Sequence, residues 1–203
     1  MRAFTIALTG GVASGKSAVE RCFVAQGIHV YDADRAAREV IEPDTDGLAA
    51  LVEAFGNDIL DDTGRLNRPA MRQRIFADRD ARTTLESIIH PRVRYWLRER
   101  AEADTGPYCL LAIPLLVENI AHYRWVDRVL VVDAPESAQI ARLMARDGID
   151  EPLARRMLAS QATRAERITL ADDVIDNEGD QAALDHQVEV LHQRYLQLAA
   201  ARR

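Results

Sequence analysis

Residues 10–17 read Gly10-Gly11-Val12-Ala13-Ser14-Gly15-Lys16-Ser17, which is the spacing G-x-x-x-x-G-K-S of a phosphate-binding loop. The apolar run before it, residues 4–9, predicts a buried strand, and the pattern over 16–26 predicts a helix that Gly27 ends. Between a strand and a helix, the glycines let backbone N–H groups approach a phosphate closely. The predicted nucleotide contacts are Gly11, Val12, Ala13, Ser14, Gly15, Lys16 and Ser17.

Lys16 is the single lysine in a chain whose 26 basic residues are otherwise all arginine. An arginine-biased chain that keeps one lysine in this loop indicates a site that needs a compact ammonium group. We expect Lys16 to reach the β- and γ-phosphate oxygens, and the Ser17 hydroxyl to ligate Mg²⁺. The guanine-reading Asn-Lys-x-Asp motif of GTPases is excluded, because it needs a second lysine.

The rest of the chain alternates short apolar runs with helical periods, which is typical of a mostly parallel α/β sheet. Further strands are expected at 28–31, 108–113, 128–132 and 173–176. Helices are expected at 34–41, 46–55, 135–147, 151–170 and 181–200, with more between Pro69 and about residue 104. The sequence therefore predicts a five-stranded parallel sheet flanked by helices.

Roughly 75 residues separate the second and third predicted strands, far more than a crossover connection requires. We interpret the excess as an inserted helical, substrate-side subdomain at 46–105, within one domain that spans 1–203. The arginine-rich helical segment at 140–170 is interpreted as a lid region.

Composition limits the possible partners. Apolar residues make up 48% of the 203 residues and charged residues 29%, which is ordinary for a globular protein. The net charge of −6 argues against electrostatic binding to nucleic acid. The longest apolar run, 109–117, is too short to span a bilayer, and the run at 3–8 lacks the flanks of a secretory signal. We expect a cytoplasmic protein, a monomer or weak homo-oligomer, that binds neither membrane nor nucleic acid and keeps its two cysteines reduced.

Two aspartates follow the second predicted strand, in the run Val30-Tyr31-Asp32-Ala33-Asp34-Arg35. In an open α/β sheet the ligand binds beyond the carboxyl ends of the strands, where the phosphate-binding loop also emerges. A kinase with an alcohol acceptor needs a carboxylate that orients the hydroxyl and accepts its proton. One aspartate of the pair could instead cap the helix that follows.

Asp133 follows another predicted strand and could be the acidic strand end of an ATPase, although Ala134-Pro135 makes that match poor. The favoured interpretation is a cap for the helix that begins at Pro135. No Cys/His spacing suggests a bound metal, so Mg²⁺ carried by ATP is the only metal we expect.

Arginines form the other candidate group. Arg142 and Arg146 lie four residues apart on one predicted helix, so both could reach a transferring phosphoryl group, or both could pair with surface carboxylates. We expect most of four further arginines to be solvated charges, namely Arg155, Arg156, Arg164 and Arg167. The basic and aromatic run at 92–100 fits a solvated helix with Val93, Trp96 and Leu97 on its apolar face better than a nucleic-acid groove.

Over about residues 4–190 the sequence resembles the dephospho-CoA kinase family. The resemblance is carried by Leu8-Thr9-Gly10-Gly11, Asp32-Ala33-Asp34, Asp62-Thr63-Gly64-Arg65-Leu66-Asn67-Arg68, His90-Pro91, Ile113-Pro114-Leu115-Leu116-Val117-Glu118, 139–142, Arg146-Asp147, Gln161 and 172–179. It implies a P-loop NTPase fold and ATP-dependent phosphorylation of the ribose 3′-hydroxyl of dephospho-CoA, the final step of coenzyme A synthesis.

The resemblance also implies roles for residues. Asp34 would be the base, with Lys16 and Arg142 as the other catalytic residues. The acceptor side would hold Thr9, Arg68, His90 and Glu118. Arg142 and Arg146 would belong to the lid side, and Asn177 and Gly179 would lie against the adenine of ATP.

Two positions depart from the family pattern. Ala13 stands where a third loop glycine is common, and Ala18 where threonine is usual. We expect a negative φ at Ala13 and a helical position for Ala18. The loop and Asp34 do not define the acceptor, so a kinase for another small alcohol or nucleoside (monophosphate) and a nucleotide-dependent binding module are the alternatives.

Overall fold

The computed structural model describes residues 2–202, which form two compact units. The sheet unit comprises residues 1–31 and 101–203, and the helical unit comprises residues 32–100. The segment 46–105, interpreted above as a subdomain, overlaps the helical unit, and both ends of the domain expected at 1–203 lie outside the described residues.

The sheet is parallel and has five strands, as the sequence predicts. They are β1 (Phe4–Gly10), β2 (His29–Asp32), β3 (Tyr108–Ala112), β4 (Arg128–Asp133) and β5 (Asp173–Asp176), in the spatial order β2-β3-β1-β4-β5. The central β1 pairs with β3 on one side, in the register Ile6↔Leu110, and with β4 on the other, in the register Gly10↔Val132. The loop that follows Gly10 therefore leaves the middle of the sheet at its carboxyl edge.

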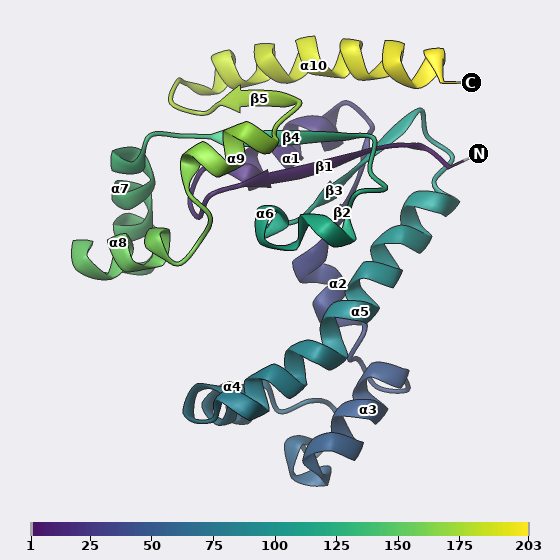
Figure 1. Cartoon of the computed structure of the whole chain (residues 1–203), viewed down its shortest axis with the longest axis vertical. Helices are drawn as coiled ribbons and strands as arrows, with labels where there is room; N and C mark the ends of the chain where they lie inside the picture. The colour runs from purple at the N-terminus through teal and green to yellow at the C-terminus, as the bar shows by residue number, and fades with distance from the viewer. Residues whose placement is uncertain (1, 203) are drawn as a thin grey trace. The chain divides into compact units, whose positions relative to one another are not determined.

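Helices of the sheet unit cover both faces of this sheet (Figure 1). They are α1 (Lys16–Ala25), α6 (Leu116–Asn119), α7 (Glu136–Asp147), α8 (Glu151–Ala159), α9 (Arg164–Leu170) and α10 (Gln181–Ala201), with the 3₁₀ turn η2 (Ile120–His122). The long α10 contacts α1, β3 and β5. Between these elements the rings of Phe23, Tyr108 and Tyr195 form a buried cluster, with the Tyr108 and Tyr195 centroids 5.5 Å apart.

The helical stretch expected at 151–170 is two helices. α8 ends at Ala159, and α9 begins at Arg164 behind a capping box in which the Thr163 and Glu166 side chains satisfy each other's backbone N–H groups. The turn between them, residues 160–163, therefore has a fixed conformation of its own.

The helical unit contains α2 (Ala33–Glu39), α3 (Asp46–Phe55), η1 (Asn57–Ile59), α4 (Arg68–Ala77) and α5 (Arg79–Ala103), which continues into the sheet unit. Its core includes Leu51, Phe55 and Met71. α5 runs through Pro91 without ending there. A proline has no N–H, so the Ser87 carbonyl four residues earlier loses its helical partner. In the same turn the Arg92 guanidinium donates to the Ile88 carbonyl at 2.8 Å.

The basic and aromatic run in α5 is confirmed as a helix with Val93 and Leu97 buried. Both cysteines are free, and burial raises the pKa of the Cys109 thiol to about 12, which keeps it unreactive. None of the helices in residues 2–202 is long and apolar enough to cross a bilayer.

Candidate active site

The loop after β1 leads directly into α1, as the G-x-x-x-x-G-K-S spacing predicts. Gly15 caps α1 in a left-handed conformation with φ of 96°, and as a glycine it has no side chain to accept a hydrogen bond from the first turn of the helix. The N–H groups at the start of a helix carry a partial positive charge and need acceptors. The start of α1 therefore offers an anion site of the kind that binds phosphate.

Two side chains from outside the loop hold its carbonyl groups. Arg142 of α7 donates from Nη1 to the Ser14 carbonyl at 3.2 Å and from Nη2 to the Asn177 carbonyl at 2.7 Å. The Asn177 side chain, beyond β5, donates to the same Ser14 oxygen at 2.8 Å. In a trans peptide the next N–H points the opposite way, so holding the Ser14 carbonyl outward turns the Gly15 N–H inward. Arg142 and Asn177 thus orient the loop for an anion.

At Gly10 and Gly15 a neighbouring side chain lies too close to leave room for a Cβ atom. A Cβ on Gly10 would lie 2.4 Å from the Ser14 Oγ, and one on Gly15 would lie 1.9 Å from the Asn177 Nδ2. The Ser14 Oγ is buried without a hydrogen-bond partner in the part of the chain that the structure describes. A larger residue at Gly10 or Gly15 would displace the groups that shape the loop.

Ala13 has φ of 56°, so the expectation of a negative φ is wrong. Ala13 and Gly15 both have positive φ, on either side of Ser14, and such left-handed positions occur in the nests of successive N–H groups that bind anions. At Ala13 this requires a conformation that costs a residue with a Cβ about 1–2 kcal/mol. A glycine, which the family resemblance leads us to expect at this position, would adopt this φ angle without that cost.

Ala13→Gly is expected to stabilise the protein. Relief of the left-handed strain exceeds the extra chain entropy of glycine, so the free energy of unfolding should rise by about 0.5–1 kcal/mol. Urea unfolding measures this, with Ala18→Gly in the first turn of α1 as the control, which should lose about 0.5–1 kcal/mol. If both substitutions lowered the free energy of unfolding equally, the backbone at Ala13 would not be strained.

The Lys16 ammonium lies 2.6 Å from the Glu20 carboxylate, one turn further along α1. Both side chains are largely buried, with exposed fractions of 15% and 17%. The ammonium is therefore held in place by a carboxylate. Contact between Lys16 and phosphate stays a prediction.

Asp133 does not cap α7, so the favoured interpretation is wrong. The N-cap of α7 is Pro135, without a side-chain bond, and the buried Asp133 carboxylate accepts hydrogen bonds from Arg164 Nε at 2.9 Å and Nη2 at 2.6 Å. This bidentate bond raises the pKa of the Arg164 guanidinium. It ties α9 to the carboxyl end of β4.

Arg167 is half-buried, and it is the exception among the four arginines of which most were expected to be solvated, since Arg155, Arg156 and Arg164 are exposed. Its Nη2 lies 2.8 Å from the point that a Cβ on Gly11 would occupy, so the guanidinium contacts the start of the loop. Burial lowers the pKa of Arg167, and its Nη1 donates to the Ala162 carbonyl. Arg155 and Arg156 are exposed, as expected, and Arg155 pairs with Glu151 on the surface of α8.

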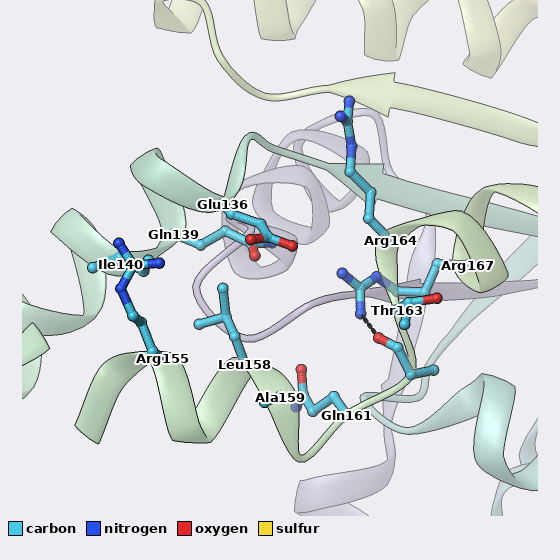
Figure 2. Close-up of a pocket in the computed structure, with 11 residues that line it drawn as sticks. Glu136, Gln139, Ile140, Arg155, Leu158, Ala159, Gln161, Thr163, Arg164 and Arg167 are labelled. Atoms are coloured by element: carbon cyan, nitrogen blue, oxygen red, sulfur yellow. Dashed lines mark hydrogen bonds between the residues drawn. The ribbon is translucent and has the colours of Figure 1, made fainter. Parts of the chain in front are cut away.

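Figure 2 shows the cavity beside these arginines, which has a volume of about 340 Å³. α7, α8 and α9 line it, together with Gln161 from the 160–163 turn and Arg167 from α9. The Gln161 side-chain oxygen accepts a hydrogen bond from the Val12 N–H at 2.8 Å. The Ala162 N–H donates to a Glu118 oxygen at 2.8 Å. Sequence alone singled out Gln161 only as part of the family resemblance.

The remaining residues predicted for the sheet unit lie as follows. Thr9 is buried and its hydroxyl donates to the Pro114 carbonyl at 3.2 Å. Glu118 lies in α6, after β3. Arg146 donates from Nε to Asp147 at 2.7 Å on the surface of α7, and Gly179 is exposed in the turn before α10.

The other predicted residues belong to the helical unit. Asp32 is the N-cap of α2, where its carboxylate accepts from the Asp34 N–H at 2.6 Å and the Arg35 N–H at 2.9 Å. Asp34 is exposed in the first turn of that helix. Arg68 begins α4 with a guanidinium nitrogen 3.6 Å from a Glu42 oxygen, and His90 is exposed in α5. Asp32 therefore takes the capping role that was considered for one aspartate of the pair, and the role of Asp34 stays a prediction.

The possible metal ligands at this site fit a metal ion that enters together with a bound phosphate. Among residues 2–202 no group of three or more His, Cys, Asp or Glu side chains could hold a metal ion. Ser17, in the first turn of α1, offers one hydroxyl beside the anion site. Mg²⁺ commonly binds through few protein ligands together with substrate phosphate oxygens, and this site matches that pattern.

Comparison with known proteins identifies relatives over nearly the whole chain. A model of the dephospho-CoA kinase family matches residues 4–183. A curated dephospho-CoA kinase of Methylococcus capsulatus is 47% identical over 196 residues, which cover 97% of this chain and 98% of that protein. Another, from Yersinia pestis, is 46% identical over 198 residues, which cover 98% of this chain and 96% of that protein.

Solved structures share the fold. A crystal structure of a Thermus thermophilus protein superposes with a TM-score of 0.79 at 28% identity, covering 96% of this chain and 98% of that one. A dephospho-CoA kinase from Campylobacter jejuni superposes with a TM-score of 0.69 at 23% identity, covering 95% of this chain and 97% of that one.

Proposed function

The chain belongs to the dephospho-CoA kinase family, and from this premise we propose which of its residues carry out the reaction. The family's reaction is the ATP-dependent phosphorylation of dephospho-CoA in coenzyme A biosynthesis. One observation supports the assignment of the ATP site to the loop at residues 10–17. Arg142 and Asn177 hold the Ser14 carbonyl of this loop, and the start of α1 has no side-chain cap.

ATP binds with its phosphates in the loop, at residues 11–17. The N–H groups at the start of α1 receive phosphate oxygens, and the Lys16 ammonium moves part of its hydrogen bonding from Glu20 to the terminal phosphates. Asn177 and Gly179 lie along the adenine. Support for this comes from Asn177, which joins the turn after β5 to the loop through the Ser14 carbonyl.

Asp34 accepts the proton of the ribose 3′-hydroxyl. The hydroxyl oxygen forms a bond to the γ-phosphorus, the bond from that phosphorus to the bridging oxygen breaks, and ADP leaves. Support comes from the start of α2, where the Asp32 carboxylate accepts hydrogen bonds from the helix N–H groups and the Asp34 carboxylate does not cap the helix. The acceptor side also includes Thr9, Arg68, His90 and Glu118, with residues 46–105 as the dephospho-CoA subdomain.

The Ser17 hydroxyl would hold the Mg²⁺ that accompanies ATP, and the metal would supply neutralisation of the phosphate charge. Arg142 and Arg146 act from the lid region, 140–170, with Arg142 as an organiser of the loop. We also propose that the protein works in the cytoplasm as a monomer or weak homo-oligomer.

Release of ADP with a panel of acceptors tests this function. Dephospho-CoA is expected to stimulate ADP release and to yield coenzyme A, identified by mass spectrometry as the 3′-phosphate. Nucleosides, nucleoside monophosphates and simple sugars should give only the background rate. Stimulation by one of these instead would favour a different alcohol acceptor, and no stimulation by any acceptor would favour a binding module.

A further inference from the structure

The turn at residues 160–163 bonds to three separate parts of the sheet unit. Gln161 Oε1 accepts the Val12 N–H of the loop at 2.8 Å, and the Ala162 N–H donates to Glu118 of α6 at 2.8 Å. The Ala162 carbonyl accepts from Arg167 of α9. These bonds join the start of the phosphate-binding loop, α6 and the lid helices through the four residues of the turn.

The Gln161 amide is chemically suited to this position. Its oxygen is a neutral acceptor, so it binds a loop N–H without placing negative charge beside the phosphates. The capping box at Thr163 fixes the far end of the turn, which leaves the Gln161 side chain a defined direction toward the loop. A side chain of the same length without an acceptor would leave the Val12 N–H without this partner.

Arg167 depends on the same turn. Its guanidinium contacts the loop at Gly11 and is held from behind by the Ala162 carbonyl. Figure 2 shows Gln161 in the turn and Arg167 on α9, and the dashed line marks the bond that Arg167 donates to the Ala162 carbonyl. A shift of the turn would therefore move a half-buried cation away from the start of the loop.

We propose that Gln161 is a positioning residue that fixes the lid region to the phosphate-binding loop during phosphoryl transfer. The inference rests on the proposed phosphate site. With the bond in place, the turn keeps Arg167 against the loop and keeps water away from the terminal phosphate. Without it, transfer to the ribose hydroxyl slows, and water attacks the γ-phosphorus in its place to give ADP and inorganic phosphate.

Gln161→Met tests the bond, because methionine has a similar length and no acceptor oxygen. We expect kcat for coenzyme A formation to fall about tenfold, the ATP dissociation constant to stay within about threefold, and the ratio of inorganic phosphate to coenzyme A to rise. Gln193→Met is the matched control, since Gln193 is exposed on α10 and bonds only to Glu189 in the contacts described, at 2.9 Å. The control should match the parent in all three quantities.

Gln161→Glu supplies the second readout. A carboxylate keeps the acceptor and the length, so the ratio of phosphate to coenzyme A should stay at the parent value. Its negative charge beside the phosphates should raise KM for ATP several-fold. If the Gln161→Met variant folds poorly, the Gln161→Glu variant tests the proposal alone. The proposal then requires an unchanged ratio of phosphate to coenzyme A together with a raised KM for ATP.

Parent values of kcat and of the phosphate to coenzyme A ratio in Gln161→Met would overturn the proposal. So would a lower kcat with an unchanged ratio, because that is the result of general structural damage, and so would a raised ratio in Gln161→Glu. Coenzyme A formation by the parent enzyme in the same assay tests the proposed function separately. If the parent enzyme forms no coenzyme A, the proposed function is wrong. If the parent forms coenzyme A and the Gln161→Met variant behaves like it, only the proposed role of Gln161 is wrong.

Discussion

Asp34→Asn is expected to lower kcat for phosphoryl transfer by about 10²–10⁴-fold, while the ATP dissociation constant stays within about threefold. Asparagine keeps the size of the side chain and one oxygen that can orient a hydroxyl, but it cannot accept the hydroxyl proton. The carboxylate acts on the acceptor, so its loss changes the rate of transfer more than the affinity for ATP. Single-turnover transfer and equilibrium ATP binding measure the two effects separately.

Asp32→Asn is the matched control, two residues away on the same segment. Asp32 caps α2, and asparagine caps a helix about as well as aspartate, so stability and kcat should both stay close to the parent values. Asp32→Ala should lose about 1 kcal/mol of unfolding free energy, because the bonds to the Asp34 and Arg35 N–H groups disappear. A crippled Asp32→Asn beside an active Asp34→Asn would reverse the assignment of the base.

The parts of the fold that depend on local sequence could be predicted. The strand, loop and helix over residues 4–26 follow from an apolar run, a glycine-rich turn and a helical period that lie next to one another. The five strands follow from short apolar runs, because both faces of a parallel sheet are covered. The break at residues 160–163 could also have been found, since Thr163 and Glu166 form the T-x-x-E pattern of a capping box.

The missed features depend on contacts between distant residues. Asp133 was interpreted from its neighbours as a helix cap, yet its partner, Arg164, is 31 residues further along the chain. Arg167 resembles the surface arginines around it, and only the folding of α9 against the loop buries it. A charge count cannot distinguish such a residue from Arg155, whose partner is one turn away on the same helix.

The φ angle at Ala13 was mispredicted for a different reason. An alanine ordinarily indicates a right-handed or extended residue, because a Cβ makes the left-handed conformation costly. Here the loop must direct successive N–H groups to one side, and the bonds from Arg142 and Asn177 to the Ser14 carbonyl hold that arrangement. Function imposes the backbone geometry against the local preference.

Lys16→Arg is expected to weaken ATP binding by about tenfold or more and to lower kcat by about 10²-fold, although the charge is unchanged. The ammonium occupies a largely buried position 2.6 Å from Glu20. A guanidinium is larger and planar and carries five N–H donors. Burial of the larger group with its additional N–H donors in this largely enclosed position would leave donors without acceptors or displace the loop.

Arg21→Lys on the exposed side of α1 is the reciprocal control. It exchanges the same two residue types one turn away, where no fixed geometry is required, and should leave ATP binding and kcat at the parent values. Equilibrium ATP binding and steady-state turnover of both variants compare the two positions directly. Near-parent activity of Lys16→Arg would mean that the single lysine reflects the arginine bias of the composition, and that the loop needs a positive charge without needing an ammonium group.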